Sequence, residues 1–301
     1  MPPALHEYTV ADWRRLRPLF HGAKTFRYRL VNAVYVRRAA PHGNRPALER
    51  EIRARKVLVT VAFNDPQVLK WQAVLVRHYV PHALHIVADN SSDRAMAAKI
   101  ATVAEQERVR YLRLPANPWS QASRSHGIAL NWLWRNLIRP GEPEAFGFLD
   151  HDLFPLAPDD PFAPLSSQDF FGVVRTAGPR WFLWAGFCMF RFDSVKHKPL
   201  DFGQDWFAGL DTGGGNWGVL YRHLDRDSLT AAPVVSCPYK PGIDANEGPL
   251  QWFASWVHEV GQMGRPELQA DRRRALARIL APHLTAAQPR TVVFNPDFRG
   301  P

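Results

Sequence analysis

Four short apolar runs in the first half of the sequence have the length of buried strands. They span residues 56–63, 85–88, 109–114 and 145–149. Apolar runs of this kind, rich in β-branched or aromatic residues and bounded by turn-forming residues such as Asn, Asp and Pro, predict strands rather than helices. The first run is apolar almost throughout, so it is expected to be covered on both faces, as in a parallel sheet.

Between these strands, side chains recur at steps of three and four, as on one face of an amphipathic helix. The three faces consist of Val68, Trp71, Leu75 and Tyr79, of Met96, Ile100 and Val103, and of His126, Ala129, Leu130, Leu133 and Leu137. Pro66 is expected in the first turn of the first helix, and Ser91 or Ser92 at the N-cap of the second. Strands that alternate with helices predict an α/β fold, with a mostly parallel central sheet and helices on both faces.

Polar side chains stand where the predicted strands end. Asn64 follows the first strand, Asp89 the second, and Asp150 and Asp152 the fourth. Ligands of such folds bind outside the carboxyl ends of the parallel strands. The predicted sheet therefore places these four residues around one binding crevice.

Asp150 and Asp152 are two residues apart, so in extended backbone they point the same way. Two carboxylates held that close repel each other, and a divalent cation beside them removes the conflict. Hard cations such as Mg²⁺ combine one or two carboxylates with phosphate oxygens. The pair predicts a site for a metal ion and a diphosphate. A second Asp-x-Asp triplet, Asp225 to Asp227, follows a mixed polar run and predicts only a solvated turn.

Several function classes are disfavoured by missing motifs. The first strand is not followed by Gly-x-Gly-x-x-Gly, and the Gly-x-x-x-x-Gly-Lys-Ser/Thr phosphate loop is absent, which argues against dinucleotide-binding domains and common ATPases. The two cysteines, Cys188 and Cys237, form no Cys-x-x-Cys pair, so neither a disulfide scaffold nor a structural zinc site is predicted. Zinc-finger and RNP patterns are also missing, which disfavours nucleic acid as a partner.

The charge balance is strongly basic. Lys and Arg number 38 against 28 Asp and Glu, a formal charge of +10. Such a balance suits an anionic partner, among them a nucleotide sugar, an anionic polysaccharide or a membrane surface. No signal-peptide pattern opens the sequence, and no apolar run reaches the roughly 18 residues of a membrane span. A cytoplasmic protein is predicted, with peripheral contact to an anionic membrane surface left open.

The composition changes along the chain and predicts three parts. Residues 1–54 form a basic extension, in which Trp13, Leu16 and Phe20 are spaced for a helix face and residues 26–36 alternate as a strand would. Residues 55–265 form the main domain, with a first half at 55–155 and a second half at 156–265. Residues 266–301 form a C-terminal helix and tail.

The first half resembles the GT-A-fold glycosyltransferases, in particular their large family 2-like group. The resemblance covers about residues 56–155 and is carried by the end of the first strand at residues 62–64, the turn at 87–93, the helix at 125–131 and the Asp150-His-Asp152 triplet. It implies that a sugar is transferred from a nucleotide-diphosphate donor to an acceptor hydroxyl of a carbohydrate or glycoconjugate, as in polysaccharide or glycoconjugate biosynthesis.

The resemblance also implies roles for residues at the strand ends. Asp150 and Asp152 would bind the divalent metal, Mn²⁺ or Mg²⁺, on the donor diphosphate. Asp89 would contact the base or ribose, and Asn64 would help it hold the nucleoside. Asn90 is grouped with them, although Asp89 and Asn90 are also common turn formers that bond their own backbone.

The second half supplies three further candidates. Three consecutive glycines at residues 213–215 predict a turn in which backbone approaches something closely. Asp211 precedes them and is the first candidate for the base that accepts the acceptor proton, with Asp205 the second. Related folds often bring a late histidine to the metal, which makes His258 a third ligand or else a strand-end residue without a role. Imidazole suits Mn²⁺ better than Mg²⁺.

Other interpretations stay open at this stage. Trp181 and Trp184, on probable strands, either stack on an acceptor sugar or belong to the core. A catalytically silent nucleotide- or sugar-binding protein would keep the same fold. A sugar-1-phosphate nucleotidyltransferase would also need paired acids, but it usually has a Gly-rich segment with Lys or Arg after the first strand, and residues 62–66 have neither.

Overall fold

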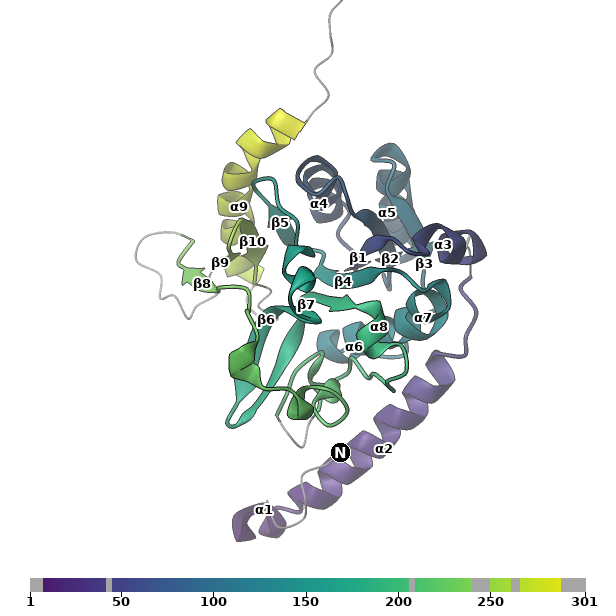
Figure 1. Ribbon diagram of the computed structural model, residues 1–301, viewed down its shortest axis with the longest axis vertical. Coiled ribbons are helices and arrows are strands. Elements are labelled where there is room, and N and C mark those ends of the chain that lie inside the picture. Colours follow the sequence, from purple (N-terminus) through teal and green to yellow (C-terminus); the bar gives the residue numbers. More distant parts are fainter. Residues whose placement is uncertain (1–7, 42–44, 206–208, 240–249, 261–265, 288–301) are drawn as a thin grey trace, which may run out of the picture.

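A six-stranded sheet organises the structure. The computed structural model describes residues 8–41, 45–205, 209–239, 250–260 and 266–287 (Figure 1). The strand order is β3-β2-β1-β4-β7-β6. The bounds are β1 Lys56–Ala62, β2 Leu84–Asp89, β3 Arg110–Arg113, β4 Ala145–Asp150, β6 Phe170–Ala177 and β7 Arg180–Arg191. Strands β1 to β4 are parallel, and β7 and β6 add an antiparallel edge. The predicted α/β class with a mostly parallel sheet is confirmed.

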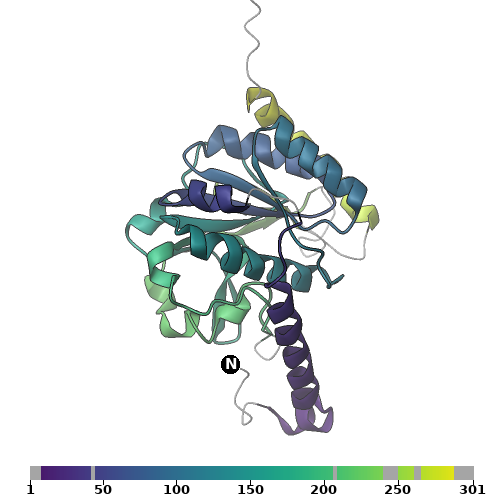
Figure 2. The same ribbon diagram turned by 90° about the vertical axis from the view of Figure 1, so that its right-hand side faces the viewer.

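The helices between the parallel strands cover both faces of this sheet (Figure 2). They are α4 Pro66–Tyr79, α5 Arg94–Gln106 and α6 Ala122–Leu133, the last continuing through a π-helical turn at Trp134–Ile138 into α7 Arg139–Gly141. Alternate residues of β1 show the two layers: Val57, Val59 and Val61 belong to the same apolar cluster as α6, whereas Leu58 packs with the end of α4. The continuous apolar run of β1 thus follows from burial on both sides.

The helix starts show one correct and one wrong prediction. Pro66 is the first residue of α4, and the Asp65 side chain accepts a hydrogen bond from the backbone N of Val68 as its N-cap. Asp93, not Ser91 or Ser92, caps α5. The two serines serve another purpose, because their hydroxyls accept hydrogen bonds from the backbone N and the side-chain amide of Asn64.

A second, four-stranded sheet has the order β5-β10-β9-β8. Its strands are β5 Leu153–Pro155, β8 Val235–Cys237, β9 Leu250–Phe253 and β10 Trp256–Glu259, and α9 Pro266–Ala287 packs beside it. Arg273 of α9 fixes the end of β10, because its guanidinium donates to Glu259 at 2.6 Å and to Asp65 at 2.8 Å. The predicted helix near the C-terminus is confirmed, and the predicted tail from residue 288 lies outside the described residues.

The N-terminal part differs from the prediction. Residues 26–36 were expected as a strand, but residues 26–35 belong to helix α2 Arg17–Tyr35, and Val36 is its C-cap. Helix α2 follows α1 Val10–Arg14 and precedes α3 Arg45–Ile52. The local alternation of apolar and basic residues was misleading, because Tyr28 and Tyr35 are seven residues apart and both turn to the body, as helix periodicity requires. The face expected for Trp13, Leu16 and Phe20 is split, since Leu16 adopts φ 52° between the two helices. The Pro- and Gly-containing segment 41–46 predicts a linker, of which residues 42–44 lie outside the described residues.

Short helical turns complete the second half. They are α8 Phe192–Val195 and the 3-10 turns Ala163–Ser166, Gly214–Asn216, Tyr221–His223 and Arg226–Ser228. No helix in the described ranges combines the length and apolarity that crossing a membrane requires.

Candidate active site

A cavity of about 620 Å³ opens at the carboxyl edge of the large sheet. Its wall combines the end of β1, the first turn of α6, the residues that follow β4, and parts of β6, β7, β9 and β10. Asp150 and Asp152 lie in this wall, together with His258 from the far end of the chain. The cavity therefore lies where ligand-binding groups were expected to gather, at the carboxyl ends of the strands.

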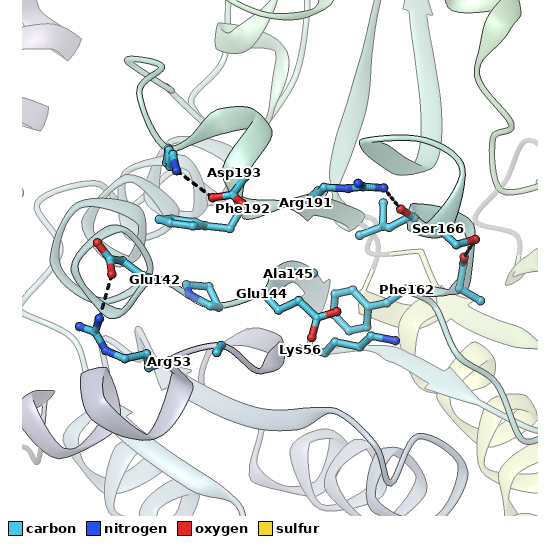
Figure 3. Close-up of a pocket in the computed structure, with 15 residues that line it drawn as sticks. Arg53, Lys56, Glu142, Glu144, Ala145, Phe162, Ser166, Arg191, Phe192 and Asp193 are labelled. Atoms are coloured by element: carbon cyan, nitrogen blue, oxygen red, sulfur yellow. Dashed lines mark hydrogen bonds and ion pairs between the residues drawn. The ribbon is translucent and has the colours of Figure 1, made fainter.

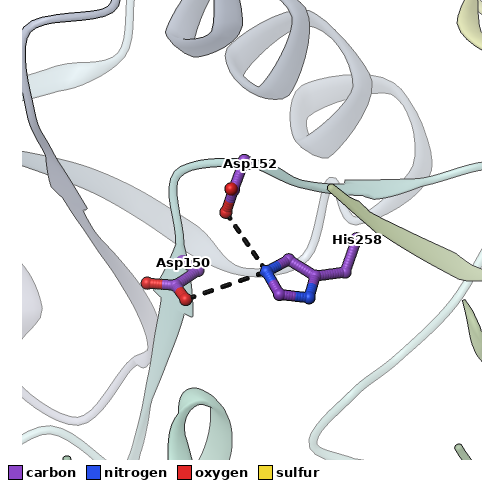
Figure 4. Close-up of side chains that lie close together, drawn as sticks. All are labelled: Asp150, Asp152 and His258. Carbon is purple, nitrogen blue, oxygen red and sulfur yellow. Dashed lines mark ion pairs between the residues drawn. The ribbon is translucent and has the colours of Figure 1, made fainter. Parts of the chain in front are cut away.

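Three potential metal ligands converge in the cavity (Figure 4). One atom each from Asp150, Asp152 and His258 lies within 4.8 Å of the others. The Nε2 atom of His258 is 3.3 Å from Asp152 Oδ1 and 3.9 Å from Asp150 Oδ2. Two carboxylate oxygens and one imidazole nitrogen facing the same point form a donor set that fits a divalent cation, and the imidazole favours Mn²⁺ over Mg²⁺.

Burial and charge oppose each other at this cluster. Burial disfavours ionisation of Asp152, but the charge of His258 and its hydrogen bond outweigh burial and hold the pKa of the carboxyl well below its usual range. The His258 ring lies between Trp184 and Phe253, with ring centroids at 4.9 and 5.8 Å. Its Nδ1 atom is buried without a hydrogen-bond partner, so the two rings and the contact of Nε2 with Asp152 set the orientation of the imidazole.

Backbone pairing explains how residues so far apart in sequence meet. The chain turns after Asp150 into β5, and β5 pairs with β10 in an antiparallel register that sets His258 opposite Leu153. The backbone N of Glu259 donates to the carbonyl of Asp152 at 3.0 Å. Asp152 and His258 are therefore held on neighbouring backbone segments, and the predicted proximity of the histidine to the acids is observed.

A buried amide supports the same turn from below. Gln72 of α4 donates to the carbonyl oxygens of Asp150 and Leu153 at 2.6 and 2.8 Å. The Thr60 hydroxyl donates to Gln72 Oε1 at 2.8 Å, so it must accept from Nε2 of His85, 3.0 Å away. Burial lowers the pKa of His85 to about 4, which keeps this ring neutral. Gln72 and its two neighbours thus fix the path of the chain between the two acids.

The predicted nucleoside contacts occupy a different setting from the acids. Asp89 is fully buried: its Oδ1 accepts from the backbone N of Ser91 at 2.9 Å, and its Oδ2 accepts from Tyr111 at 2.9 Å and forms an ion pair with Arg113 at 2.9 Å. Asn64 ties the two strand-end turns together through the serines and the N of Asp93. Neither Asn64 nor Asp89 belongs to the cavity wall, and their contact with a nucleoside stays a prediction.

Asn90 lies in the cavity wall itself. Its side-chain amide donates to Ser125 Oγ at 2.9 Å and accepts from Asn117 at 3.0 Å. This network holds the first turns of α6 against the end of β2. A ligand in the cavity would meet Asn90 at its edge, which fits its grouping with the nucleoside contacts without testing that role.

The two candidate bases are separated by the structure. Asp211 is exposed in the cavity wall, and its Oδ1 accepts from Gln204 at 3.0 Å. Asp205 pairs through its backbone with Leu210 and does not belong to the cavity wall. The glycines after Asp211 pack closely, as predicted: a Cβ atom at Gly213 would lie 2.6 Å from the carbonyl oxygen of Leu183. Residues 206–208 of this stretch lie outside the described residues.

Two cavity residues, His126 and Arg175, are not among the predicted site residues, because His126 on a helix face was interpreted as a half-buried histidine without a role. The Nδ1 atom of His126 lies 3.7 Å from Asp150 Oδ1, and its Nε2 atom is buried without a hydrogen-bond partner. Topology was an available signal, because a helix that precedes a parallel strand begins at the carboxyl edge of the sheet. Arg175 donates to Gln251 at 2.8 Å and lies over the ring of Trp184. Burial lowers the pKa of this guanidinium, and nearby Asp211 opposes the shift.

The two tryptophans considered as sugar-stacking residues lie in different environments. Trp181 is buried against Tyr221 and belongs to the core, whereas Trp184 lines the cavity.

Asp225 caps the exposed turn Arg226–Ser228, so the predicted solvated turn is confirmed. The triplet at the end of β4 lines the cavity of about 620 Å³, and Asp225 to Asp227 are not part of its wall.

No family model and no curated protein matches the sequence. Among solved structures, the mannosyltransferase PcManGT from Pyrobaculum calidifontis, in complex with GDP-Man and Mn²⁺, is similar at 12% identity and a TM-score of 0.45, over 91% of this chain and 75% of that chain. Glucosyl-3-phosphoglycerate synthase from Mycobacterium tuberculosis, in complex with Mn²⁺, UDP and glucosyl-3-phosphoglycerate, is similar at 15% identity and a TM-score of 0.43. This likeness covers 81% of this chain and 85% of that chain.

The galactosyltransferase LgtC, in complex with donor and acceptor sugar analogs, is similar at 15% identity and a TM-score of 0.34. That likeness covers 46% of this chain and 59% of LgtC. All three likenesses concern the course of the backbone.

Proposed function

We propose that this protein is a metal-dependent glycosyltransferase that moves a sugar from a nucleotide-diphosphate donor to an acceptor hydroxyl. The observation that carries the proposal is the convergence of Asp150, Asp152 and His258 in a cavity at the carboxyl edge of a parallel sheet. Among the described residues, neither acid has a Lys or Arg partner within salt-bridge distance. Acids left without such partners are available to a metal ion and, through it, to a diphosphate.

The three ligands would hold the cation on the donor side of the cavity. When bound, a divalent cation supplies Lewis-acid neutralisation of the diphosphate leaving group. Arg175 lines the same cavity and offers a second positive charge to phosphate oxygens. Trp184 presents a ring beside it, and an aromatic face suits the apolar face of a sugar.

Asp211 is the proposed base that takes the proton of the acceptor hydroxyl. In the proposed step the bond between the sugar C1 and the donor phosphate oxygen breaks, and the acceptor oxygen forms a new bond to C1. The acceptor hydroxyl loses its proton to the Asp211 carboxylate, and the nucleoside diphosphate leaves with the bonding electron pair. Asp211 is exposed to the cavity and keeps one oxygen, Oδ2, outside its bonds to Gln204 and Thr212.

The decisive experiment combines nucleotide binding with turnover. Titration calorimetry with UDP and GDP, with and without Mn²⁺, should show binding that depends on the metal. Asp150→Asn with Asp152→Asn should abolish this metal-dependent binding. Asp225→Asn with Asp227→Asn, the same change in the exposed triplet, should leave it unchanged. Circular dichroism verifies that both variants fold.

Turnover then separates the candidate functions. Release of UDP or GDP from a panel of nucleotide sugars, in water and with added sugar acceptors, is expected for the transferase. Binding without release would identify a silent binding protein. Pyrophosphate release from a nucleoside triphosphate and a sugar 1-phosphate would identify a nucleotidyltransferase. Binding and release that survive in the Asp150/Asp152 variant would overturn the proposal.

A further inference from the structure

Helix α2 carries an apolar stripe on the side that faces away from the protein. Leu19, Phe26, Leu30 and Val34 are separated by seven, four and four residues, so they share one face of the helix. Their side chains are exposed by 62%, 71%, 57% and 51%. A soluble helix normally turns such a stripe to the core, and a contiguous exposed one marks an interaction surface.

The opposite side of the same helix is firmly attached to the body. The Tyr28 hydroxyl donates to Asp201 at 3.1 Å, and the Tyr35 hydroxyl donates to the carbonyl of Pro115 at 3.1 Å. Asn131 of α6 donates to Asn32 at 3.2 Å. The stripe therefore belongs to an anchored helix, which both views show extending away from the sheets with α1 at its far end (Figures 1 and 2).

The charge around the stripe has a single sign. Residues 13–48 contain no Asp or Glu, and they contain nine Lys or Arg, namely Arg14, Arg15, Arg17, Lys24, Arg27, Arg29, Arg37, Arg38 and Arg45. Arg27 and Arg29 flank Phe26 and Leu30 along the helix. Two salt bridges join this segment to acids among the described residues, Arg17 with Asp12 and Arg45 with Glu49. Most of these cations form no salt bridge among the described residues, so their charge is available to an external partner.

We propose that α1 and α2 dock on an anionic lipid bilayer. Exposed Trp13, Phe20 and Phe26, together with the aliphatic residues of the stripe, would enter the boundary between headgroups and acyl chains, while the arginines meet the phosphates. An apolar stripe with basic flanks is the composition that interfacial helices need, because apolar burial and anionic attraction act together.

A second copy of the chain is a poorer occupant. If two stripes packed against each other, two segments that span residues 13–48 would come into contact. Each segment contains nine cations and no acid. Like charges at such short distances are repulsive.

The bilayer also has a consequence for the active site, because α2 packs on α6, whose first turn lines the cavity. Docking would fix how far the cavity lies from the membrane.

Vesicle binding by the full chain tests the proposal. The protein should sediment with vesicles of phosphatidylcholine mixed with phosphatidylglycerol, and much less with phosphatidylcholine alone. Phe26→Gln with Leu30→Gln keeps the net charge and should weaken binding by more than about tenfold. Arg14→Gln with Arg29→Gln should also weaken it and reduce its salt dependence. Val235→Gln, which removes an exposed apolar side chain of β8, is the matched control and should bind as the unaltered protein does.

Each other outcome contradicts the proposal. Absence of binding to the anionic vesicles would do so, as would binding that survives Phe26→Gln with Leu30→Gln. Light scattering that shows a dimer, dissociated by the same variant, would assign the stripe to a second copy. Release from the vesicles by glycerol phosphate would indicate a headgroup pocket instead of a bilayer surface. Metal-dependent nucleotide binding, which the stripe variants should retain, shows that they are folded and keeps this proposal separate from that of the active site.

Discussion

Two cavities lined by described residues lie at opposite edges of the same sheet, and the larger of the two is the less suited to chemistry. The larger cavity, of about 1060 Å³, lies at the amino ends of β1 and β4 (Figure 3). The cavity with Asp150 and Asp152 is smaller, at about 620 Å³. The difference lies in how the charges of the two walls are satisfied.

Each Lys and Arg in the wall of the larger cavity has a carboxylate partner. The four pairs are Arg53 with Glu142 at 2.9 Å, Lys56 with Asp160 at 3.1 Å, Lys196 with Asp193 at 2.9 Å and Arg191 with Asp169 at 3.3 Å. In the smaller cavity, by contrast, two acids share only imidazole neighbours among the described residues. Carboxylates that converge without a Lys or Arg partner are what a cation requires, so charge pairing and convergence together locate the candidate site better than volume does.

The largest effect on turnover is expected from substitution of the proposed base in the smaller cavity. Asp211→Asn in the smaller cavity should lower turnover by about 10²- to 10⁴-fold, because the acceptor hydroxyl loses its proton acceptor. Metal-dependent nucleotide binding should stay unchanged, since Asp211 is not one of the converging ligands. Steady-state kinetics and calorimetry on the same preparations measure the two quantities.

Asp193→Asn is the matched change in the wall of the larger cavity and should leave turnover unaltered. Asp205→Asn tests the second candidate base. Should Asp205→Asn reduce turnover while Asp211→Asn does not, the proton acceptor would lie outside the cavity wall described here, and the proposed assignment would be wrong.

A smaller effect is expected from the amide beneath the acidic turn. Gln72→Met keeps the length of the side chain but removes the two hydrogen bonds to the carbonyls of Asp150 and Leu153. Residues that orient metal ligands typically contribute about 10- to 100-fold to affinity, so the Mn²⁺ affinity should fall within that range. Calorimetric titration with Mn²⁺ measures it.

Gln168→Met provides the control for this change. Gln168 also donates to two carbonyl oxygens, those of Phe170 and Thr230, but it lies away from the acids. Its substitution should lower stability without changing Mn²⁺ affinity. Equal losses of affinity in both variants would show that Gln72 acts through general stability and not through the position of the acids.

The sequence predicts the central sheet well because its strands are marked locally. The β1 and β4 segments are continuous apolar runs that end in polar residues, a pattern that depends only on burial of the strand itself. Residues 26–36 show the limit of such local patterns. Alternating apolar and basic residues fit a strand over a few positions, whereas the helical spacing of Tyr28 and Tyr35 becomes decisive only with a body for them to pack on.

The site residues divide in the same way. Asp150 and Asp152 follow from their position at a strand end, but the approach of His258 depends on the pairing of β10 with β5, which spans about a hundred residues. Only the family resemblance suggested it. The burial of Asp89 was hidden for the same reason, because its partners Tyr111 and Arg113 come from β3, and the register between β2 and β3 cannot be read from either strand alone.

The smallest expected effect concerns a paired charge at the larger cavity. Asp160 accepts from Lys56 at 3.1 Å and from the backbone N of Phe162 at 2.9 Å. Burial opposes ionisation of Asp160, but these two hydrogen bonds and nearby His82 outweigh burial and lower the pKa of the carboxyl from its usual 3.8. Since the pKa is lower in the folded state, ionised Asp160 stabilises the fold above pH 3.8, and this contribution disappears as the pH falls through the folded-state pKa.

Asp160→Asn should therefore lower the free energy of unfolding by less than about 1 kcal/mol at neutral pH, because the ion pair is partly exposed. The difference from the unaltered protein should vanish in acid, as measured by urea unfolding at several pH values. Turnover and Mn²⁺ affinity should not change. A loss of Mn²⁺ affinity in Asp160→Asn would mean that the two cavities are coupled across the sheet, and the contrast between paired and unpaired walls would no longer locate the site.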